Sequence, residues 1–216
     1  MKTQLRSIRF LFERNGVDHG LKGDIFLVRI DTGKILPNVC LQYDPGSNIL
    51  YTARLKKATE EDIFNSYDLK FMEKYNRGRP DRDKIKIRKK YEINSLYIGM
   101  PQGLQYQSVV LLNNIYRVRT EQIVRKISEI PEDVVLKCCD LYNQVQKIKR
   151  LKEQLGILKK KIQLAKINNE DYSDLEKQFE IIRTEIGYPE YVKRNKYPFL
   201  HYREVPNKGY IKIYRG

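Results

Sequence analysis

Basic side chains gather between residues 70 and 90 in a pattern that suits contact with a phosphate backbone. Ten Lys or Arg stand there against three acidic residues, a local balance of +7. Alternation along an extended chain sends Lys84, Lys86 and Arg88 to one face, where cations position a nucleic acid without reading its bases. The alternative is a solvated loop without a partner. The candidate nucleic-acid contacts are Arg77, Arg79, Lys84, Lys86, Arg88, Lys89 and Lys90.

The whole chain shares this positive charge. Its 216 residues include 42 Lys or Arg and 27 Asp or Glu, which gives a net charge of +15. A surplus of this size attracts polyanions, so nucleic acid is the leading class of partner. An anionic membrane surface, an acidic protein partner and a solvated lysine-rich surface are the alternatives. The 16 Tyr suit stacking surfaces as well as cores.

Residues for metal or nucleophilic chemistry are few. His19 and His201 are the only histidines, and the spacing of Cys40, Cys138 and Cys139 fits no zinc site. The sequence therefore predicts no metal and no cofactor, and the odd number of cysteines predicts reduced thiols in the core. A proton shuttle at His19 is one interpretation, although a lone His is more often structural. No nucleotide-binding loop, Ser/His/Asp set or paired-carboxylate motif is present.

No segment has the pattern of a signal peptide or a membrane span. The first residues, MKTQLRSIRFLF, are short and interrupted by Arg, and no run approaches the roughly 18 apolar residues of a membrane helix. We therefore expect a cytoplasmic protein without membrane contact.

Short strand-like runs separated by turn signals predict an antiparallel meander. Asp31-Thr32-Gly33 and Asp44-Pro45-Gly46-Ser47 are the strongest turn signals. The predicted strands are 23–30, 37–43, 48–56 and 108–118.

Helical spacing predicts several helices before the C-terminal third of the chain. They cover 3–14, part of 60–75, 120–127 with Thr120 as its cap, and a helix after Ile130-Pro131 with acidic residues in its first turn.

A long helical hairpin is predicted from residue 141 to residue 187. Its apolar positions step mostly by four and three, as in a coiled coil, and Asn168-Asn169 marks the turn. The apolar stripe is narrow, so we expect the hairpin to project from the remaining fold. The tail, 188–216, is basic and rich in Tyr, and it closes with the strand-like GYIKIYR.

Two separated stretches resemble the PemK/MazF family. GDIFLVRID (23–31) followed by LPNVCLQYD (36–44) is similar to that family's first hairpin, and GLQYQSVVLLNNIYRVRTEQIVRKISEIPEDVVLKCCDLY (103–142) is similar to its later strands and C-terminal helix. The resemblance implies an α+β fold: a small SH3-like antiparallel β-barrel with flanking helices in residues 1–140. A basic insertion at about 60–100 and the projecting C-terminal hairpin lie outside the match.

Members of this family dimerise, cleave single-stranded RNA without a metal, and are blocked by a protein antitoxin. In that reaction a 2′-hydroxyl attacks the adjacent phosphate, a base takes its proton, and a cation neutralises the developing charge. The family places these roles near an Arg before the Pro of the second strand and near a Thr or Ser that ends the third. Here Leu36 precedes Pro37 and Arg54 falls near the Thr position. The candidate catalytic residues are Arg54 and Lys34 as cations and Thr52, or else Tyr51, as a hydroxyl; the alternative is that these are outward-facing strand residues without a chemical role.

The leading hypothesis is a PemK/MazF-like toxin that binds RNA and acts as a metal-independent endoribonuclease on single-stranded RNA. Its expected partners are RNA, an acidic antitoxin and a second copy of the chain. The first alternative is a catalytically inactive member of the fold that binds nucleic acid or protein, which the residues at 36 and 54 favour. The second is a structural or assembly protein that works through the coiled-coil hairpin.

Overall fold

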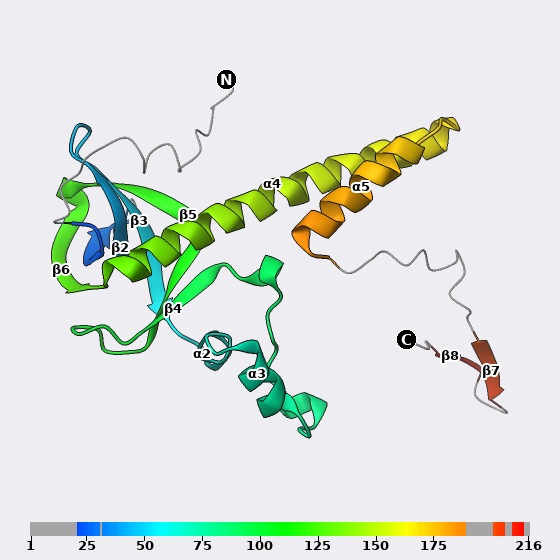
Figure 1. The fold of residues 1–216 in the computed structure, drawn as a ribbon, viewed down its shortest axis with the longest axis horizontal. Helices are drawn as coiled ribbons and strands as arrows, with labels where there is room; N and C mark the ends of the chain where they lie inside the picture. Colours follow the sequence, from blue (N-terminus) through cyan, green and yellow to red (C-terminus); the bar gives the residue numbers. More distant parts are fainter. Residues whose placement is uncertain (1–20, 31, 189–200, 206–208, 214–216) are drawn as a thin grey trace. The chain divides into compact units, whose positions relative to one another are not determined.

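The computed structural model describes residues 21–30, 32–188, 201–205 and 209–213, the last two ranges by their backbone alone. The chain is α+β, with a six-stranded antiparallel sheet, a two-stranded sheet and several helices (Figure 1). It divides into two compact units, Met1–Glu153 and Gln154–Gly216. The helix predicted for 3–14 and His19 lie outside the described residues.

The main sheet has the strand order β4-β5-β3-β2-β1-β6, with every neighbouring pair antiparallel. The predicted meander and the strand at 108–118 are confirmed. The strands are β1 (Asp24–Arg29), β2 (Ile35–Asp44), β3 (Ile49–Lys57), β4 (Ser95–Gly99), β5 (Ser108–Arg119) and β6 (Ile123–Glu129).

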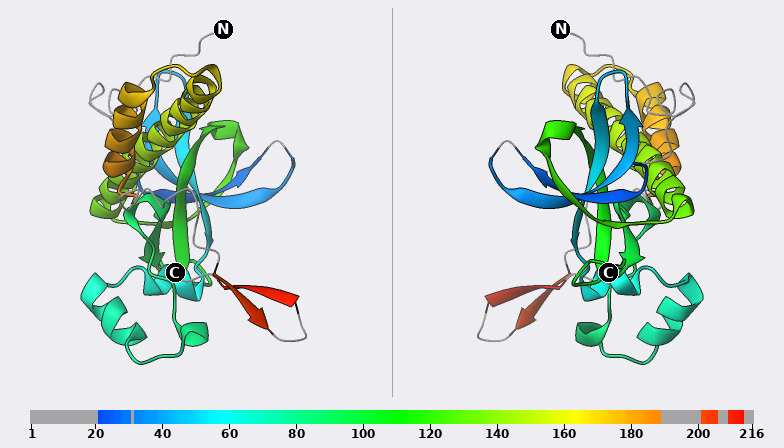
Figure 2. Two further views of the ribbon diagram at one scale, coloured as in Figure 1. Left: turned by 90° about the vertical axis from the view of Figure 1, so that its right-hand side faces the viewer. Right: turned by 90° about the vertical axis from the view of Figure 1, so that its left-hand side faces the viewer.

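Irregular pairing twists this sheet strongly. β3 pairs with β5 at Thr52↔Tyr116 and again at Arg54↔Leu111. Between these two pairs β5 contains three more residues than β3. Bulges of this kind bend a strand and increase its twist. Figure 2 shows the result, with β1 and β2 (blue) crossing the direction of β5 (green).

The two edges of the sheet approach each other through the loop that follows β4. Ser128 on β6 donates a hydrogen bond from its Oγ to the carbonyl of Gln102. Gly103 has a φ of +91°, and a Cβ there would collide with the carbonyl oxygen of Ile127. Glycine therefore permits the contact by which this curved sheet closes toward a barrel.

The sheet has two apolar faces, and helix α4 (Glu132–Asn168) covers one of them. Val135, Cys138 and Cys139 of α4 pack into the same cluster as Val39 and Ala53 of the sheet. The prediction of reduced core cysteines is confirmed, because Cys40, Cys138 and Cys139 are free and buried.

The predicted pair of C-terminal helices is also confirmed. α4 ends at a turn where Asn169 has a positive φ, and α5 (Ser173–Ile186) folds back beside it (Figure 1). Leu158 and Ile162 are buried, as the seam predicts, whereas Ile157 and Leu164 are exposed.

The insertion consists of short elements joined by irregular chain. It contains α2 (Glu60–Phe64), α3 (Leu69–Asn76) and the 3₁₀ turns η1 (Asp81–Asp83) and η2 (Lys90–Glu92). The strand alternation considered for the basic run IKIRKK (85–90) is wrong, because this segment pairs with no strand of the described residues. Strand β4, which the sequence reading missed, closes the insertion.

The helix predicted for 120–127 is also wrong. Only the 3₁₀ turn η3 (Thr120–Gln122) forms there, and the chain then enters β6, which pairs along β1. β-branched Ile123 and Val124 favour a strand, and the free edge of β1 supplies the hydrogen-bonding partner.

The C-terminal tail forms a hairpin of β7 (His201–Val205) and β8 (Gly209–Ile213). The strand-like end of the tail is thereby confirmed, and β7 was not predicted. Within the described part of the chain, no helix is long and apolar enough to cross a membrane.

Candidate nucleic-acid interface

The sheet face that α4 leaves uncovered carries the candidate residues of β2 and β3. Asn38 pairs with Arg54 and Cys40 pairs with Thr52. Residues directly opposite each other share a face, and alternate residues of a strand do too. All four therefore point away from the face whose Ala53 packs in the α4 cluster.

Arg54 and Thr52 share this face but differ in exposure. Arg54 is exposed, and its side chain makes no ion pair or hydrogen bond with any residue from 21–30 or 32–188. Thr52 is fully buried, and its Oγ1 has no hydrogen-bond partner in the described structure; the same holds for Oδ1 of Asn38, which is 2% exposed. The hydroxyl predicted for catalysis thus lies inside the fold, and only the guanidinium reaches the surface.

Lys34, the second predicted cation, belongs to the turn between β1 and β2. Its carbonyl accepts a hydrogen bond from Ile30 N at 2.9 Å, and the residue is exposed. Four residues separate it from Asn38, the partner of Arg54, which corresponds to about 13 Å along a strand. The structure therefore does not bring Lys34 next to Arg54.

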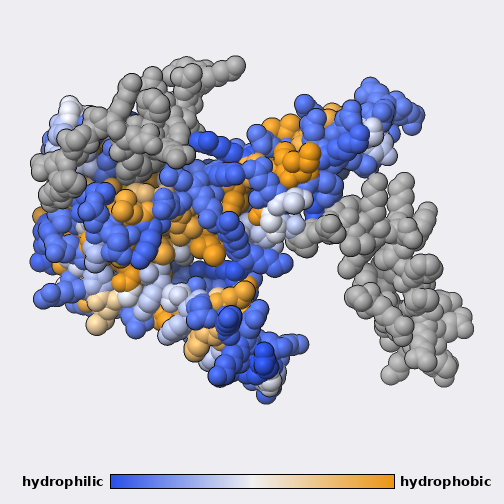
Figure 3. Space-filling model, viewed as in Figure 1, coloured by the Kyte–Doolittle hydropathy of each residue, from blue (hydrophilic) through white to orange (hydrophobic). Residues whose placement is uncertain are grey.

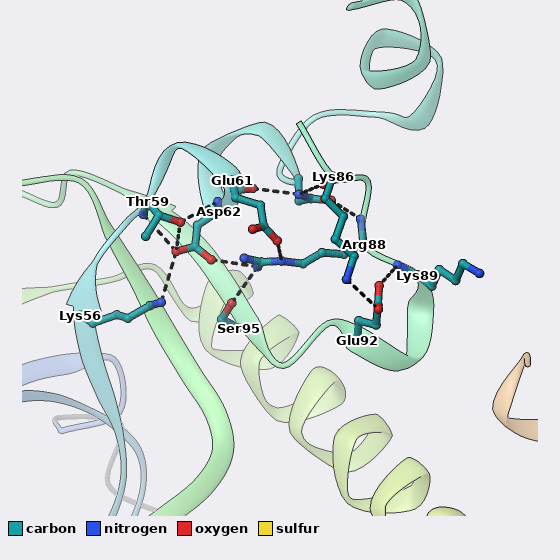
Figure 4. Close-up of polar contacts among 10 residues, drawn as sticks. Lys56, Thr59, Glu61, Asp62, Lys86, Arg88, Lys89, Glu92 and Ser95 are labelled. Atoms are coloured by element: carbon teal, nitrogen blue, oxygen red, sulfur yellow. Dashed lines mark hydrogen bonds and ion pairs between the residues drawn. The ribbon is translucent and has the colours of Figure 1, made fainter. Parts of the chain in front are cut away.

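Arg88 is the anchor of the insertion (Figure 4). Its Nε lies 2.7 Å from Oε1 of Glu61 and its Nη1 lies 2.8 Å from Oδ1 of Asp62. The Asp62 side chain is 1% exposed, and Lys56 of β3 lies 3.4 Å from its Oδ2. One buried carboxylate therefore connects the sheet to both ends of the insertion.

A capping box at the start of α2 holds this carboxylate in place. Asp62 accepts hydrogen bonds from the Thr59 backbone N and Oγ1, at 3.0 Å and 2.8 Å, and its own N donates to Thr59 Oγ1. Burial by itself raises the pKa of Asp62. The Thr59 hydrogen bonds, with the neighbouring Arg88 and Lys56, outweigh burial and lower the pKa from 3.8 to about 2. Asp62 is therefore ionised wherever the protein is folded near neutral pH.

Two asparagines clamp the basic run in an extended conformation. Asn76 exchanges two hydrogen bonds with the backbone of Ile85, at 2.8 Å and 3.1 Å. Asn65 donates to the carbonyl of Lys86 at 2.9 Å and accepts from Arg88 N at 2.7 Å. The run is thus fixed to α2 and α3 by side-chain amides, which replace the strand partners it lacks.

Most predicted nucleic-acid contacts in this run are already paired within the protein. The Nζ of Lys86 lies 2.8 Å from Oε1 of Glu92, and the Nζ of Lys84 lies 2.7 Å from Oδ1 of Asp81. Lys89 lies 6.0 Å from the centroid of the Tyr91 ring.

Two other predicted contacts lack a partner. Arg77 and Lys90 are exposed and have no side-chain partner within the described ranges. Arg79 differs, because its guanidinium stacks on the Tyr75 ring with 3.9 Å to the centroid.

Sequence reasoning missed the residues that organise the insertion. The signal for Asp62 was present, since Thr59-Glu60-Glu61-Asp62 has the spacing of a capping box. No comparable signal marks the two asparagines, whose partners lie 9 to 23 residues away. No cluster of three or more His, Cys, Asp or Glu that would hold a metal ion occurs among the described residues.

No family model matches this chain, and no curated protein matches its sequence. Two solved structures are similar to part of it. An endoribonuclease in complex with its cognate antitoxin from Mycobacterial species has 8% identity and a TM-score of 0.37, over 59% of this chain and 94% of that one. The Mycobacterium tuberculosis toxin MazF-mt6 has 14% identity and a TM-score of 0.35, over 59% and 96%. TM-scores of this size do not establish a shared fold.

Proposed function

We propose that this chain is a PemK/MazF-like toxin that binds single-stranded RNA on the sheet face carrying Arg54 and cleaves it without a metal. The observation that carries the proposal is the exposed guanidinium of Arg54, which has no partner among the described residues, on the face that α4 does not cover. β3 lies between β2 and β5 in the sheet, and these neighbours belong to the two stretches that resemble the family. Arg54 thus stands where the resemblance expects the reacting phosphate.

The guanidinium suits this role because none of its hydrogen bonds is used inside the described fold. A free Arg binds a phosphate through two parallel hydrogen bonds and stays charged at any physiological pH. In cleavage, the 2′-oxygen bonds to phosphorus as the bond to the 5′-oxygen breaks, and negative charge builds on the phosphate oxygens. Arg54 stabilises that charge. The products expected are a 2′,3′-cyclic phosphate and a 5′-hydroxyl.

A cleavage assay in EDTA tests the proposal. We expect a labelled single-stranded RNA to be cut equally with and without EDTA, and Arg54→Ala to lower the rate about 100-fold, the scale of losing one charge-stabilising donor. Arg29→Ala is the matched control. Arg29 is also exposed, but it follows Val28 on β1 and so points to the opposite side of the sheet from Phe26 and Val28, which lie on the same face as Arg54. Activity that EDTA abolishes and magnesium restores would overturn the mechanism.

A second candidate is an RNA-binding member of the fold that does not cleave. It is favoured by the burial of Thr52, which leaves Arg54 without an accessible hydroxyl beside it, and by Leu36, which stands before Pro37 where the family has an Arg. Binding that depends on Arg54, with no product after long incubation, supports this candidate against the first.

Control by an acidic antitoxin and assembly into a homodimer belong to the first candidate. The net charge of +15 supports an acidic partner. Co-expression with a small acidic protein encoded beside this chain should then relieve growth arrest. A chain that arrests growth equally with and without that neighbour has no such antitoxin.

A further inference from the structure

An aromatic stripe lies on α3 and the residue chain just before it, outside the sheet face that carries Arg54. Its members are four positions apart in the sequence and are Tyr67, Phe71, Tyr75 and Arg79. Two of them, Phe71 and Tyr75, lie on one side of α3, whereas Tyr67 precedes the helix and Arg79 follows it. The ring centroids of Tyr67 and Phe71 lie 4.6 Å apart, and those of Phe71 and Tyr75 lie 6.4 Å apart with stacked planes. The Arg79 guanidinium lies over the Tyr75 ring, 3.9 Å from its centroid. The four groups therefore form one continuous row.

Two rings of the aromatic stripe remain open to solvent. Tyr67 is 50% exposed and Phe71 is 43% exposed, whereas Met72 on the same helix is buried. Figure 3 shows hydrophobic surface next to strongly hydrophilic surface over the α2 and α3 part of the molecule. Tyr75 is held from beneath by buried Phe64, with 5.1 Å between ring centroids. The stripe is thus fixed on its inner side and exposed on its outer side.

A basic stripe runs beside the aromatic one. Lys70, Lys74 and Arg77 precede Phe71, Tyr75 and Gly78 by one residue each, so the two lysines lie about 100° around α3 from the rings. All three cations are exposed, and none has an ion-pair partner in the part of the chain that the structure describes. Open rings and cations without a described ion-pair partner therefore lie in neighbouring rows on α3 and on the residues that flank it.

We infer that these two rows form a binding site for single-stranded RNA, in which bases stack on Tyr67 and Phe71 while the basic stripe contacts phosphates. The inference rests on the RNA binding proposed above and adds a contact surface on the insertion. Proteins that bind single strands combine a cationic track with aromatic faces on which successive bases stack. In a duplex, the neighbouring base pairs stack on both faces of each base, so this site takes single strands.

An acidic protein surface is the competing occupant. It would use the basic stripe but would gain little from flat, exposed rings, since carboxylates do not stack on them. The row of neighbouring rings, with a guanidinium over the Tyr75 ring, favours planar ligands. RNA is therefore the occupant that uses both rows.

The test uses the full chain and two fluorescein-labelled strands of about 12 nucleotides. One is a mixed-sequence 2′-O-methyl oligonucleotide, which lacks a free 2′-hydroxyl and cannot be cleaved. The other is an abasic strand of equal length and charge. We expect Tyr67→Leu with Phe71→Leu to weaken binding of the first strand about tenfold or more, and to leave binding of the abasic strand unchanged. Phe71→Tyr should bind both strands as the unaltered chain does, because it keeps the aromatic face.

Leu69→Ala is the control for general loss of apolar surface. Leu69 is 55% exposed on the same helix, and it lies two positions from Phe71 and so about 200° around the axis. An unchanged affinity of the double variant for the base-bearing strand overturns the inference, as does an equal loss on the abasic strand or with Leu69→Ala. If the double variant fails to fold, Phe71→Leu alone decides by the same criteria.

The same titrations separate this inference from the proposed function. If Arg54→Ala weakens binding and the double variant does not, RNA binding at the sheet face is supported and the aromatic site is overturned. If the unaltered chain binds neither strand, the proposed RNA binding and the aromatic site are both overturned.

Discussion

The insertion contains two basic segments that use their charge in opposite ways. On α3 and directly after it, the basic stripe of Lys70, Lys74 and Arg77 is exposed and has no ion pair within the described structure. In the run from 84 to 88, all three cations lie within 2.8 Å of a carboxylate oxygen. A cation that already has a carboxylate partner must lose that contact before it can bind a phosphate. The density of Lys and Arg therefore does not reveal which charges are available; the partners within reach decide it.

Burial sharpens the difference between the two segments. The Arg88 side chain is 17% exposed and its partner Asp62 is 1% exposed, so this pair supports the fold more than it serves a ligand. The pairs of Lys84 and Lys86 are more open to solvent and contribute little to stability. The two lysines are thus intermediate between the anchor and the basic stripe.

Removal of the anchor is expected to give the largest effect. Arg88→Ala leaves a buried carboxylate with weaker compensation, and we expect the free energy of unfolding to fall by about 3 kcal/mol. Urea denaturation followed by circular dichroism measures it. The matched control is Arg77→Ala, an exposed and unpaired Arg of the same insertion, which should change stability by less than about 0.5 kcal/mol. Equal effects of the two substitutions would remove the distinction between the segments.

The pH dependence of stability tests the anchor from its acidic side. The folded pKa of Asp62 is about 2, below the ordinary value of 3.8, so its ionised form stabilises the fold. This contribution, about 2 kcal/mol, is complete above roughly pH 4 and is lost as the pH falls through 2.

The variant Asp62→Asn has no titrating carboxyl at this position, so its stability can be compared with that of the unaltered chain as the pH changes. Between pH 6 and pH 2, the unaltered chain should lose about 2 kcal/mol more stability than the variant. Parallel pH profiles of the two proteins would show that the carboxylate is not stabilised by its partners.

The smallest expected effect concerns the salt dependence of RNA binding. Each phosphate contact to a single strand contributes about −0.7 to the slope of log affinity against log salt. Changing Lys70, Lys74 and Arg77 together to Gln should flatten the slope by about 2. Changing Lys84 and Lys86 to Gln should flatten it by less than about 1, because their charge is already partly neutralised by Asp81 and Glu92. A larger effect of the second variant would place the RNA on the clamped run.

The sequence by itself determined the features that depend on neighbouring residues. Short strand-like runs between turn signals predicted the strands 23–30, 37–43 and 48–56, which form β1, β2 and β3. Steps of three and four predicted the helices on both sides of Asn168-Asn169. Side-chain periodicity and turn geometry are local, so they can be read without knowing what packs against them.

Only the tertiary structure decided the features that depend on distant partners. Residues 123–129 form a strand because they pair with the edge of β1, although a helix had been predicted for 120–127. Arg88 became an anchor because Glu61 and Asp62, 27 and 26 positions earlier, lie within 2.8 Å of it. Thr52 was placed inside the fold while Arg54, on the same face, remained exposed. Strand pairing and ion pairing join residues far apart in the chain, and the types of nearby residues do not specify which partners will meet.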